Sequence, residues 1–237
     1  MERVTFKNSR NLSLAGIFYQ FKSNKAIVVA HGLLANKDRP RLVELSDAFN
    51  KAGFAVLRFD FSACGESDAD LVTVGNEVDD LKAAISFIAS KGFKEIGIWG
   101  ESLGGLVSLM AFSDRIKAMV LWAPVTDKKV PAFEKSYKRP DGQFVVQKDG
   151  REFKIGDEYF GVRKSVNPKT LLSRISIPIL IIHGDADEEI PLEWSKHAMT
   201  LLPPKSHLLI IKGLGHKPGP KLDEVINSSI EWFKSHL

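Results

Sequence analysis

Short apolar runs alternate along the chain with longer stretches in which apolar residues recur every three or four positions. The runs have the length and β-branched character of buried strands, whereas the longer stretches have the period of amphipathic helices. The strand-like runs cover residues 26–30, 55–59, 96–99, 119–122, 179–182 and 208–211. Because strands that alternate with helices build a mostly parallel sheet with helices on both faces, the pattern predicts an α/β fold.

The predicted helices follow the strands, over residues 42–52, 78–88, 103–111, 194–201 and 222–233. Gly53 and Gly92 follow the first two of them, as glycines do at the ends of many helices. Ahead of the first buried strand, residues 4–6 and 12–18 predict two strands joined as a local hairpin. Ligands of such sheets bind at the carboxyl ends of the strands, so we expect each catalytic residue just after a strand.

The segment between residues 122 and 179 does not follow this alternation of strands and helices. Within it, residues 144–147 and 151–155 alternate in polarity on either side of Asp149-Gly150. An Asp-Gly pair between two such runs is a strong signal for a β-hairpin. We therefore expect one domain over residues 1–237, with a small cap inserted at about residues 127–168 over the active-site edge of the sheet.

Composition narrows the class of protein without fixing its function. The chain has 237 residues, enough for one domain with its own core, and 44% of them are hydrophobic, as in ordinary globular proteins. The net charge of +4 comes from Lys and Arg interleaved with acids, so we expect no nucleic-acid partner. The single cysteine, Cys64, excludes an internal disulfide and a cysteine-built zinc site. With no apolar leader and no membrane-length apolar stretch, we expect a cytoplasmic protein that does not enter a membrane.

The motif Gly100-Glu101-Ser102-Leu103-Gly104 stands where a predicted strand gives way to a predicted helix. A turn that sharp forces the serine into an unfavourable backbone conformation and brings neighbouring chain close, so the flanking positions must lack side chains. Gly100 and Gly104 meet that need. The Ser102 hydroxyl is then expected above the sheet at a helix N-terminus, which makes it the candidate nucleophile.

A serine hydroxyl becomes a good nucleophile only when a base removes its proton and a carboxylate orients that base. Of the six histidines, His216 is the candidate base because it follows the last predicted strand on a glycine loop. The other five lie inside a predicted helix, at the chain end, before the last strand, or directly before a glycine in segments with other roles. Asp187, after the penultimate strand, is the candidate acid, with Asp185 and Asp127 as alternatives. The acids around Asp187 are bunched without repeated ligand spacing, so we expect no metal site.

The order Ser102, Asp187, His216 along the chain is the order found in α/β-hydrolases. Such a site also needs an oxyanion hole, formed by two backbone N–H groups. The N–H of Leu103 follows the nucleophile, and that of Leu33 lies on the loop after an early strand. Each donor of this kind stabilises the transition state by roughly 2.7 to 4 kcal/mol.

The sequence resembles the α/β-hydrolase superfamily along nearly its full length. The matching segments are His31-Gly32, Arg58-Phe59-Asp60 with Gly65-Glu66-Ser67, Gly100 to Gly105, His183-Gly184 with Asp187 and Ile190-Pro191, and Gly215-His216. The resemblance implies an eight-stranded, mostly parallel sheet. It also favours Asp187 over Asp185, because the family acid stands three residues after the His-Gly pair.

Within the superfamily the chain resembles small bacterial carboxylesterases of the cinnamoyl and feruloyl esterase type. The resemblance rests on the early His-Gly loop, on Arg58-Phe59-Asp60 and on a short cap that carries a hairpin. In that family, polar cap residues hold the phenolic end of an aromatic acyl group. The implied counterparts here are Tyr159, Asp141 and Gln143. Monoglyceride lipases and acyl-peptidases share the same motifs, so the acyl preference stays open.

The expected function is therefore hydrolysis of carboxylic esters through an acyl-enzyme, with a small-molecule ester as partner and no cofactor. Short-chain or aromatic acyl groups are the expected substrates. Peptide or thioester cleavage and monoglyceride hydrolysis on the same triad are alternatives, and a non-catalytic ligand-binding protein of the same fold is another. The sequence does not fix the oligomeric state, and a homodimer is one of the open options.

Overall fold

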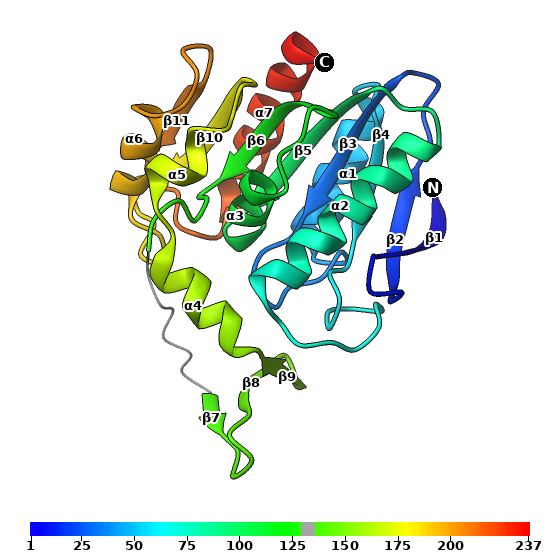
Figure 1. Cartoon of the computed structure of the whole chain (residues 1–237). Helices are drawn as coiled ribbons and strands as arrows, with labels where there is room; N and C mark the ends of the chain where they lie inside the picture. The colour runs from blue at the N-terminus through cyan, green and yellow to red at the C-terminus, as the bar shows by residue number, and fades with distance from the viewer. Residues whose placement is uncertain (129–135) are drawn as a thin grey trace.

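The computed structural model describes residues 1–128 and 136–237 and is built on an eight-stranded sheet with strand order β1-β2-β4-β3-β5-β6-β10-β11 (Figure 1). The strands are β1 (Glu2–Lys7), β2 (Ser13–Tyr19), β3 (Lys25–Ala30), β4 (Ala55–Phe59), β5 (Glu95–Glu101), β6 (Ile116–Trp122), β10 (Ile179–Gly184) and β11 (His207–Ile211). Only β2 runs antiparallel to its neighbours, and every other pair in this sheet is parallel. The predicted α/β-hydrolase fold, with its mostly parallel sheet, is confirmed.

Helices cover both faces of the sheet (Figure 1). They are α1 (Pro40–Lys51), α2 (Val74–Ser90), α3 (Leu103–Met110), α6 (Leu192–Met199) and α7 (Leu222–His236). One hydrophobic core lies under α2, α3 and α6, and a second lies under α1 and α7. Both cores consist of aliphatic and aromatic side chains from strands buried on both faces, as expected for a parallel sheet.

The local signals in the sequence account for how individual helices begin and end. Gly53 follows α1 with φ +106°, and Gly92 follows α2 with φ +94°, backbone conformations that favour glycine. At the start of α2, the Thr73 hydroxyl accepts a hydrogen bond from the N–H of Asn76 at 3.0 Å and so caps the helix.

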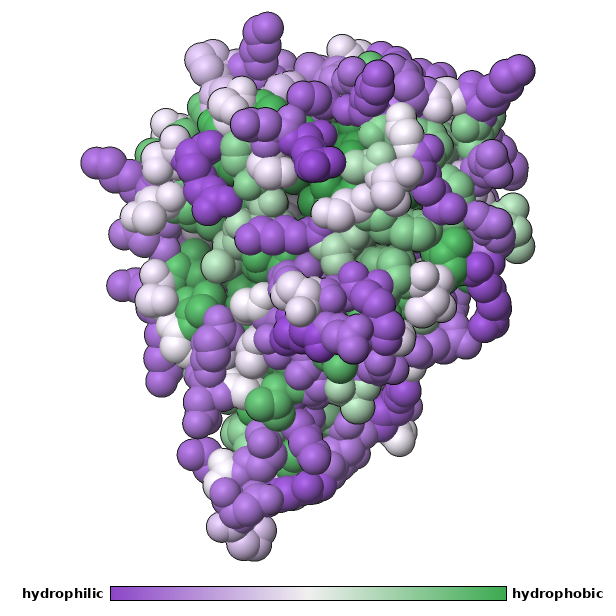
Figure 2. Space-filling view, turned by 45° about the vertical axis from the view of Figure 1, so that its right-hand side comes forward, coloured by the Kyte–Doolittle hydropathy of each residue, from purple (hydrophilic) through white to green (hydrophobic). Residues whose placement is uncertain are grey.

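The cap follows β6 and contains a three-stranded sheet and two short helices. Its elements are β7 (Ser136–Lys138), β8 (Phe144–Lys148), β9 (Arg151–Ile155), α4 (Asp157–Ser165) and α5 (Pro168–Leu172). Asp149 and Gly150 both have positive φ and join β8 to β9, so the predicted hairpin is present. The first residues of the predicted insertion at 127–168 include 129–135, which lie outside the described residues. Figure 2 shows the cap as a tapering, largely hydrophilic end of the molecule.

Several contacts join the cap to the body of the domain. Val72 pairs with Ile155 as a parallel β-bridge next to the start of α2. A carboxylate oxygen of Glu158 accepts a hydrogen bond from the Val74 N–H at 3.1 Å, at the N-terminus of α2 where a negative charge is favourable. A further contact comes from Lys148 at the cavity, whose Nζ donates a hydrogen bond to the Leu33 carbonyl at 2.8 Å. The cap therefore rests on the sheet edge at its α2 side.

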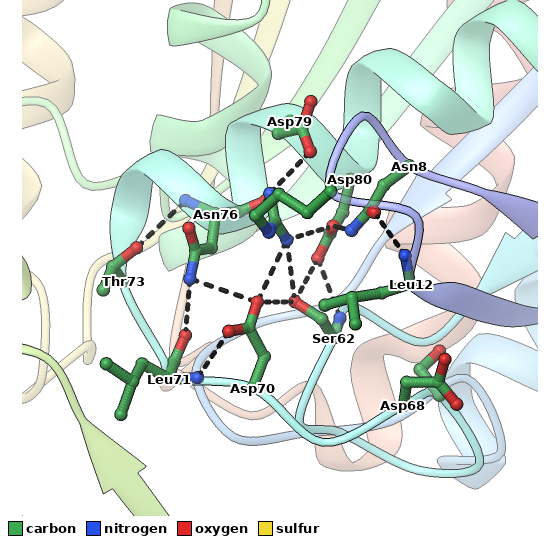
Figure 3. Close-up of polar contacts among 12 residues, drawn as sticks. Asn8, Leu12, Ser62, Asp68, Asp70, Leu71, Thr73, Asn76, Asp79 and Asp80 are labelled. Atoms are coloured by element: carbon green, nitrogen blue, oxygen red, sulfur yellow. Dashed lines mark hydrogen bonds and ion pairs between the residues drawn. The ribbon is translucent and has the colours of Figure 1, made fainter.

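A polar network, here called the Arg10 cluster, fastens the β1–β2 hairpin to α2 (Figure 3). The Arg10 guanidinium forms ion pairs with Asp70, Asp79 and Asp80, at 3.1, 2.5 and 2.8 Å respectively. Asp80 has no exposed side-chain surface and also accepts hydrogen bonds from Ser62 and Asn8. The cluster holds together three segments that are far apart in the sequence.

Cys64 lies in the core beneath the cap side of the sheet and is 1% exposed. Burial raises the pKa of its thiol well above the ordinary value, which keeps it in the unreactive protonated form. Within the described ranges 1–128 and 136–237, no helix is long and apolar enough to span a membrane.

Candidate active site

The strand β5 turns into α3 at Ser102, whose backbone has φ 53° and ψ −115°. This conformation is strained for a residue with a side chain. A Cβ atom at Gly104 would lie 2.5 Å from the carbonyl oxygens of Ala30 and His31, and one at Gly100 would lie 2.8 Å from the carbonyl oxygen of Gly104. The turn therefore has the close packing that the Gly-x-Ser-x-Gly spacing predicts.

The backbone around Ser102 is fixed by hydrogen bonds at both ends. Its N–H donates to the carbonyl of Trp122 at the end of β6, at 2.8 Å, and its carbonyl accepts from the N–H of Val125 at 3.2 Å. These bonds connect the turn to the neighbouring strand. Ser102 is thus held rigidly at the carboxyl edge of the sheet although it lies on a turn.

Asp187 and His216 form a hydrogen-bonded pair on the loops after β10 and β11. The Nδ1 atom of His216 lies 2.8 Å from Oδ2 of Asp187, whose side chain is fully buried. Because an ionised carboxylate only accepts hydrogen bonds, Nδ1 carries the proton and donates it. The other carboxylate oxygen accepts backbone N–H groups from Glu189 and Ile190, both at 2.9 Å. Asp187 therefore has a fixed orientation before any ligand binds.

Asp187 and His216 each change the pKa of the other side chain. Burial would raise the pKa of Asp187, but hydrogen bonds from His183, His216 and the Ile190 N–H hold that pKa well below its usual range. Burial would lower the pKa of His216, but the hydrogen bond and charge of Asp187 outweigh it and raise that pKa above its ordinary value. The pair thus favours a protonated imidazole next to an ionised carboxylate, which is the state a general base reaches after taking a proton.

The alternative acids have other partners in the structure. An oxygen of Asp185 accepts the Gly213 N–H and fastens the loop that leads to His216. Asp127 accepts the N–H of the adjacent Lys128. Of the three aspartates considered from the sequence, Asp187 is the one that contacts His216.

Buried histidines elsewhere near the sheet edge serve the fold. His31 lies 2.8 Å from the Gly32 carbonyl through Nδ1, and its Nε2 accepts the Phe61 N–H at 3.2 Å. Both ring nitrogens of His183 are also engaged, with the Ser195 hydroxyl and the Ile190 carbonyl. These two rings brace the loops and have no nitrogen left to serve as a base.

Two backbone N–H groups stand where an oxyanion hole is predicted. Leu103 is the first residue of α3, and Leu33 follows β3 on the Gly32–Leu33 loop. Neither N–H donates to an acceptor in the part of the chain that the structure describes. The loop is held by Glu101, whose Oε1 accepts the Gly32 N–H at 3.1 Å.

A cavity of about 550 Å³ opens at this edge of the sheet, and Ser102, His216 and Leu33 line it. Its lining residues from the body are Gly32, Leu33, Leu34, Ala35, Arg39, Arg41, Glu101, Ser102, Trp122, Glu189, His216 and Lys217. The cap contributes Val146, Gln147, Lys148 and Asp149. Ser102 and the His216 ring face the same space, and no hydrogen bond joins them among the described residues. Free enzymes often show long or unformed catalytic hydrogen bonds that tighten when substrate binds.

The cap residues implied by the esterase resemblance lie away from this cavity. Tyr159 is 1% exposed and packs in the core under α4, next to Phe160. Burial raises the pKa of its hydroxyl well above the ordinary value. Asp141 lies in the exposed turn between β7 and β8 and accepts the Gln143 N–H. The Gln143 side chain donates to backbone carbonyls within the cap sheet, at Phe144 and Ile155. The structure thus gives these three residues contacts within the cap, and other cap residues line the cavity.

Sequence reasoning missed the charged residues of the cavity wall. Arg41 and Glu101 form a two-bonded ion pair, with Nε at 2.8 Å and Nη2 at 2.5 Å from the carboxylate oxygens. Lys148 comes from the cap hairpin, and Lys217 follows His216. Lys217 could have been noticed as the neighbour of the candidate base, whereas nothing local in the sequence places Arg41 or Lys148 at the site. Within residues 1–128 and 136–237, no cluster of side chains suits a metal ion.

Comparison with curated proteins finds partial matches. The chain is 33% identical over 109 residues to quorum-quenching protein AidA from Acinetobacter baumannii, covering 43% of this chain and 36% of that protein. It is 26% identical over 182 residues to the mitochondrial palmitoyl-protein thioesterase ABHD10 from Rattus norvegicus, covering 71% of this chain and 60% of that protein. The chain therefore spans less than two thirds of the length of these relatives.

Comparison with solved structures finds matches over the whole fold. The structure of Est1E from Butyrivibrio proteoclasticus with ferulic acid bound superposes with a TM-score of 0.81, at 22% identity and with 98% of each chain covered. At that identity the likeness concerns the fold. The family model described as the alpha/beta hydrolase fold matches residues 25–149, which is more than half of the 237 residues. The chain belongs to the α/β-hydrolase family.

Proposed function

We propose that this chain is a serine hydrolase that cleaves carboxylic esters, with Ser102 as nucleophile, His216 as general base and Asp187 as the residue that orients the base. The observation that carries the proposal is the Asp187–His216 hydrogen bond at the wall of a cavity that Ser102 also lines. A buried carboxylate, a histidine with one nitrogen left and a strained serine meet at one sheet edge. Few structural roles require all three.

The proposed reaction has two steps. Because Asp187 occupies Nδ1 of His216, Nε2 is the nitrogen left to take the proton from the Ser102 hydroxyl. The Ser102 oxygen attacks the ester carbonyl and forms a tetrahedral intermediate, whose oxyanion is stabilised by the N–H groups of Leu33 and Leu103. His216 then gives its proton to the leaving alcohol, and an acyl-enzyme remains. In the second step His216 activates a water molecule that releases the acid.

The acyl preference is proposed to be for short or aromatic acyl groups. The cavity of about 550 Å³ is of a size suited to small ligands, and both charged and apolar side chains line it, among them Leu34, Trp122 and Val146. The structural neighbour Est1E was solved with ferulic acid, which supports the aromatic case. The relative named a palmitoyl-protein thioesterase makes thioester cleavage the second candidate.

Two measurements test the proposal. A fluorophosphonate probe is expected to label the wild-type protein and to leave Ser102→Ala unlabelled, because only an activated serine reacts. A panel of acetate, butyrate, octanoate and ferulate esters, with a matched butyryl thioester, then ranks the acyl groups. Equal labelling of wild type and Ser102→Ala would reject Ser102 as nucleophile, and failure to label either would favour a non-catalytic protein.

A further inference from the structure

The cavity wall carries more positive than negative charge, because it holds four cations, Arg39, Arg41, Lys148 and Lys217, and three carboxylates, Glu101, Asp149 and Glu189. Two of its cations have carboxylate partners within the wall: Arg39 pairs with Asp149, and Arg41 pairs with Glu101. Lys148 and Lys217 also line the cavity, and neither forms an ion pair with a carboxylate of the described residues. In the part of the chain that the structure describes, two lysines of the cavity wall therefore have no carboxylate partner.

Lys148 is placed more deeply than a surface lysine. It ends β8, and its Nζ donates a hydrogen bond to the Leu33 carbonyl at 2.8 Å, from the cap to the loop that carries a proposed oxyanion donor. One hydrogen bond to a neutral carbonyl leaves the other ammonium hydrogens open. Burial lowers the pKa of Lys148, and the nearby charges of Arg39 and Lys217 lower it further, against the opposing charge of Asp149. The ammonium is thus partly removed from water, and no carboxylate of residues 1–128 and 136–237 forms an ion pair with it.

A partly buried cation without a counter-ion costs free energy in the empty site. If Lys148 served only to attach the cap, a neutral donor would do so at a lower desolvation cost. An anionic group of a ligand would offset that cost and gain a charge-assisted hydrogen bond. The cation lies beside the loop where the substrate carbonyl is proposed to bind, so such a group would belong to the substrate itself.

We propose that Lys148 binds a carboxylate carried by the substrate, so that the enzyme prefers monoesters of dicarboxylic acids over neutral esters of similar length. Lys217, at the rim beside His216, adds to the attraction. The inference rests on the proposed ester hydrolysis at Ser102 and specifies its substrate class. It makes Lys148 a specificity-determining residue.

The test compares two esters with the same leaving group, 4-nitrophenyl hydrogen adipate and 4-nitrophenyl hexanoate, and uses Ser102→Ala to subtract background hydrolysis. The wild type is expected to have the higher kcat/KM on the adipate ester. In Lys148→Met the ratio of the two kcat/KM values is expected to fall on the order of tenfold, as for loss of a hydrogen bond to a charged group. Lys148→Arg should retain most of the preference, and Lys148→Glu should reverse it.

Lys154→Met is the matched control, because Lys154 is an exposed lysine of the same hairpin and lies outside the cavity wall. Its ratio is expected to equal that of the wild type. If Lys148 acts only by attaching the cap, Lys148→Met slows both esters alike and the unchanged ratio overturns this inference. A wild type without preference for the adipate ester also overturns it while leaving ester hydrolysis intact. Absence of Ser102-dependent hydrolysis of either ester would instead reject the proposed function, and this inference with it.

Discussion

Asp80 and Asp187 are both fully buried aspartates, and each forms a hydrogen bond with a basic side chain. They differ in the environment of that side chain, which is Arg10 for Asp80 and His216 for Asp187. Asp80 accepts hydrogen bonds from Arg10 and from both polar groups of Ser62. The terminal nitrogens of Arg10 also pair with Asp70 and Asp79 in this network (Figure 3), whereas its buried Nε has no hydrogen-bond partner among the described residues. Asp187 holds His216 through one nitrogen only, and that ring also lines a cavity.

The comparison shows which feature separates a structural cluster from a reactive one. The burial and hydrogen bonding of the two carboxylates are alike, so neither property alone marks a functional site. The difference lies in the partner. His216 lines an open cavity, and its Nε2 makes no hydrogen bond among the described residues, with the nearest carboxylate oxygen, of Glu189, 3.8 Å away. The terminal nitrogens of Arg10 are all paired with acids. Unused hydrogen-bonding capacity beside a cavity is therefore the more useful criterion in this chain.

The largest expected effect comes from exchanging each carboxylate for its amide. Asp187→Asn is expected to lower kcat by about ten thousandfold, because an amide does not hold the imidazole in the required tautomer. Asp80→Asn is expected to keep kcat within a factor of about three, since the Arg10 cluster lies away from the cavity. Steady-state hydrolysis of a 4-nitrophenyl ester measures both. A comparable loss of activity in Asp80→Asn would remove the contrast between the two clusters.

The next largest effect is on the free energy of unfolding and is expected for the Arg10 cluster. Asp80→Ala leaves Arg10 without its most buried partner and removes the acceptor of the Ser62 N–H. It is expected to lower the free energy of unfolding by about 3 kcal/mol, as for breaking a buried charge pair. Urea denaturation followed by circular dichroism gives this value. Ser102→Ala is measured in parallel. It is expected to be at least as stable as the wild type, because the substitution removes no buried ion pair.

A smaller effect is a shift in the pH dependence of activity. The base must be neutral to accept the Ser102 proton, and the pKa of His216 is raised, so kcat/KM is expected to rise with pH to a midpoint above the ordinary histidine value of about 6.5. The residual activity of Asp187→Asn should have a lower midpoint, since the charge that raises the pKa is gone. Asp80→Asn should leave the midpoint where it is in the wild type. A midpoint that Asp187→Asn does not move would mean that another group governs the profile.

The smallest effect is expected at the proposed oxyanion hole. Leu33 contributes its backbone N–H to the reaction, so Leu33→Ala is expected to change kcat by less than about fivefold. Leu33→Pro removes that N–H and is expected to cost about a hundredfold or more, as for loss of one oxyanion donor. As the control for folding, both variants should show a cooperative thermal unfolding transition with a midpoint close to that of the wild type. Equal activities of the two variants would exclude the Leu33 N–H from the mechanism.

Most of the fold could be predicted because its strands are buried on both faces and read as continuous apolar runs. The predicted run at 26–30 lies within β3 (Lys25–Ala30), and the hairpin around Asp149-Gly150 is present. Element ends were less well predicted, since polar residues such as Lys117 occupy the start of β6 and weaken the apolar signal. Helix α4 and strand β7 were not predicted, because short elements of mixed polarity have no clear period.

The residues of the candidate site also differ in how well the sequence predicts them. Ser102, Asp187 and His216 each follow a strand and carry local sequence signals, so they could be named as candidates before their arrangement was known. Lys148 and Arg41 reach the cavity through long-range packing, Lys148 from the cap hairpin and Arg41 from the second position of α1. No short-range pattern encodes such a placement, so the sequence indicates neither residue as part of the site.

The buried state of Cys64 has a practical consequence for following the cap in solution. The chain contains one cysteine, and its thiol is both inaccessible and held protonated. A cysteine introduced at an exposed cap position, such as Lys154→Cys, would therefore be the one thiol that a maleimide dye or spin label modifies in the folded protein. Site-specific spectroscopy of the hairpin during turnover would then need no prior removal of a native thiol.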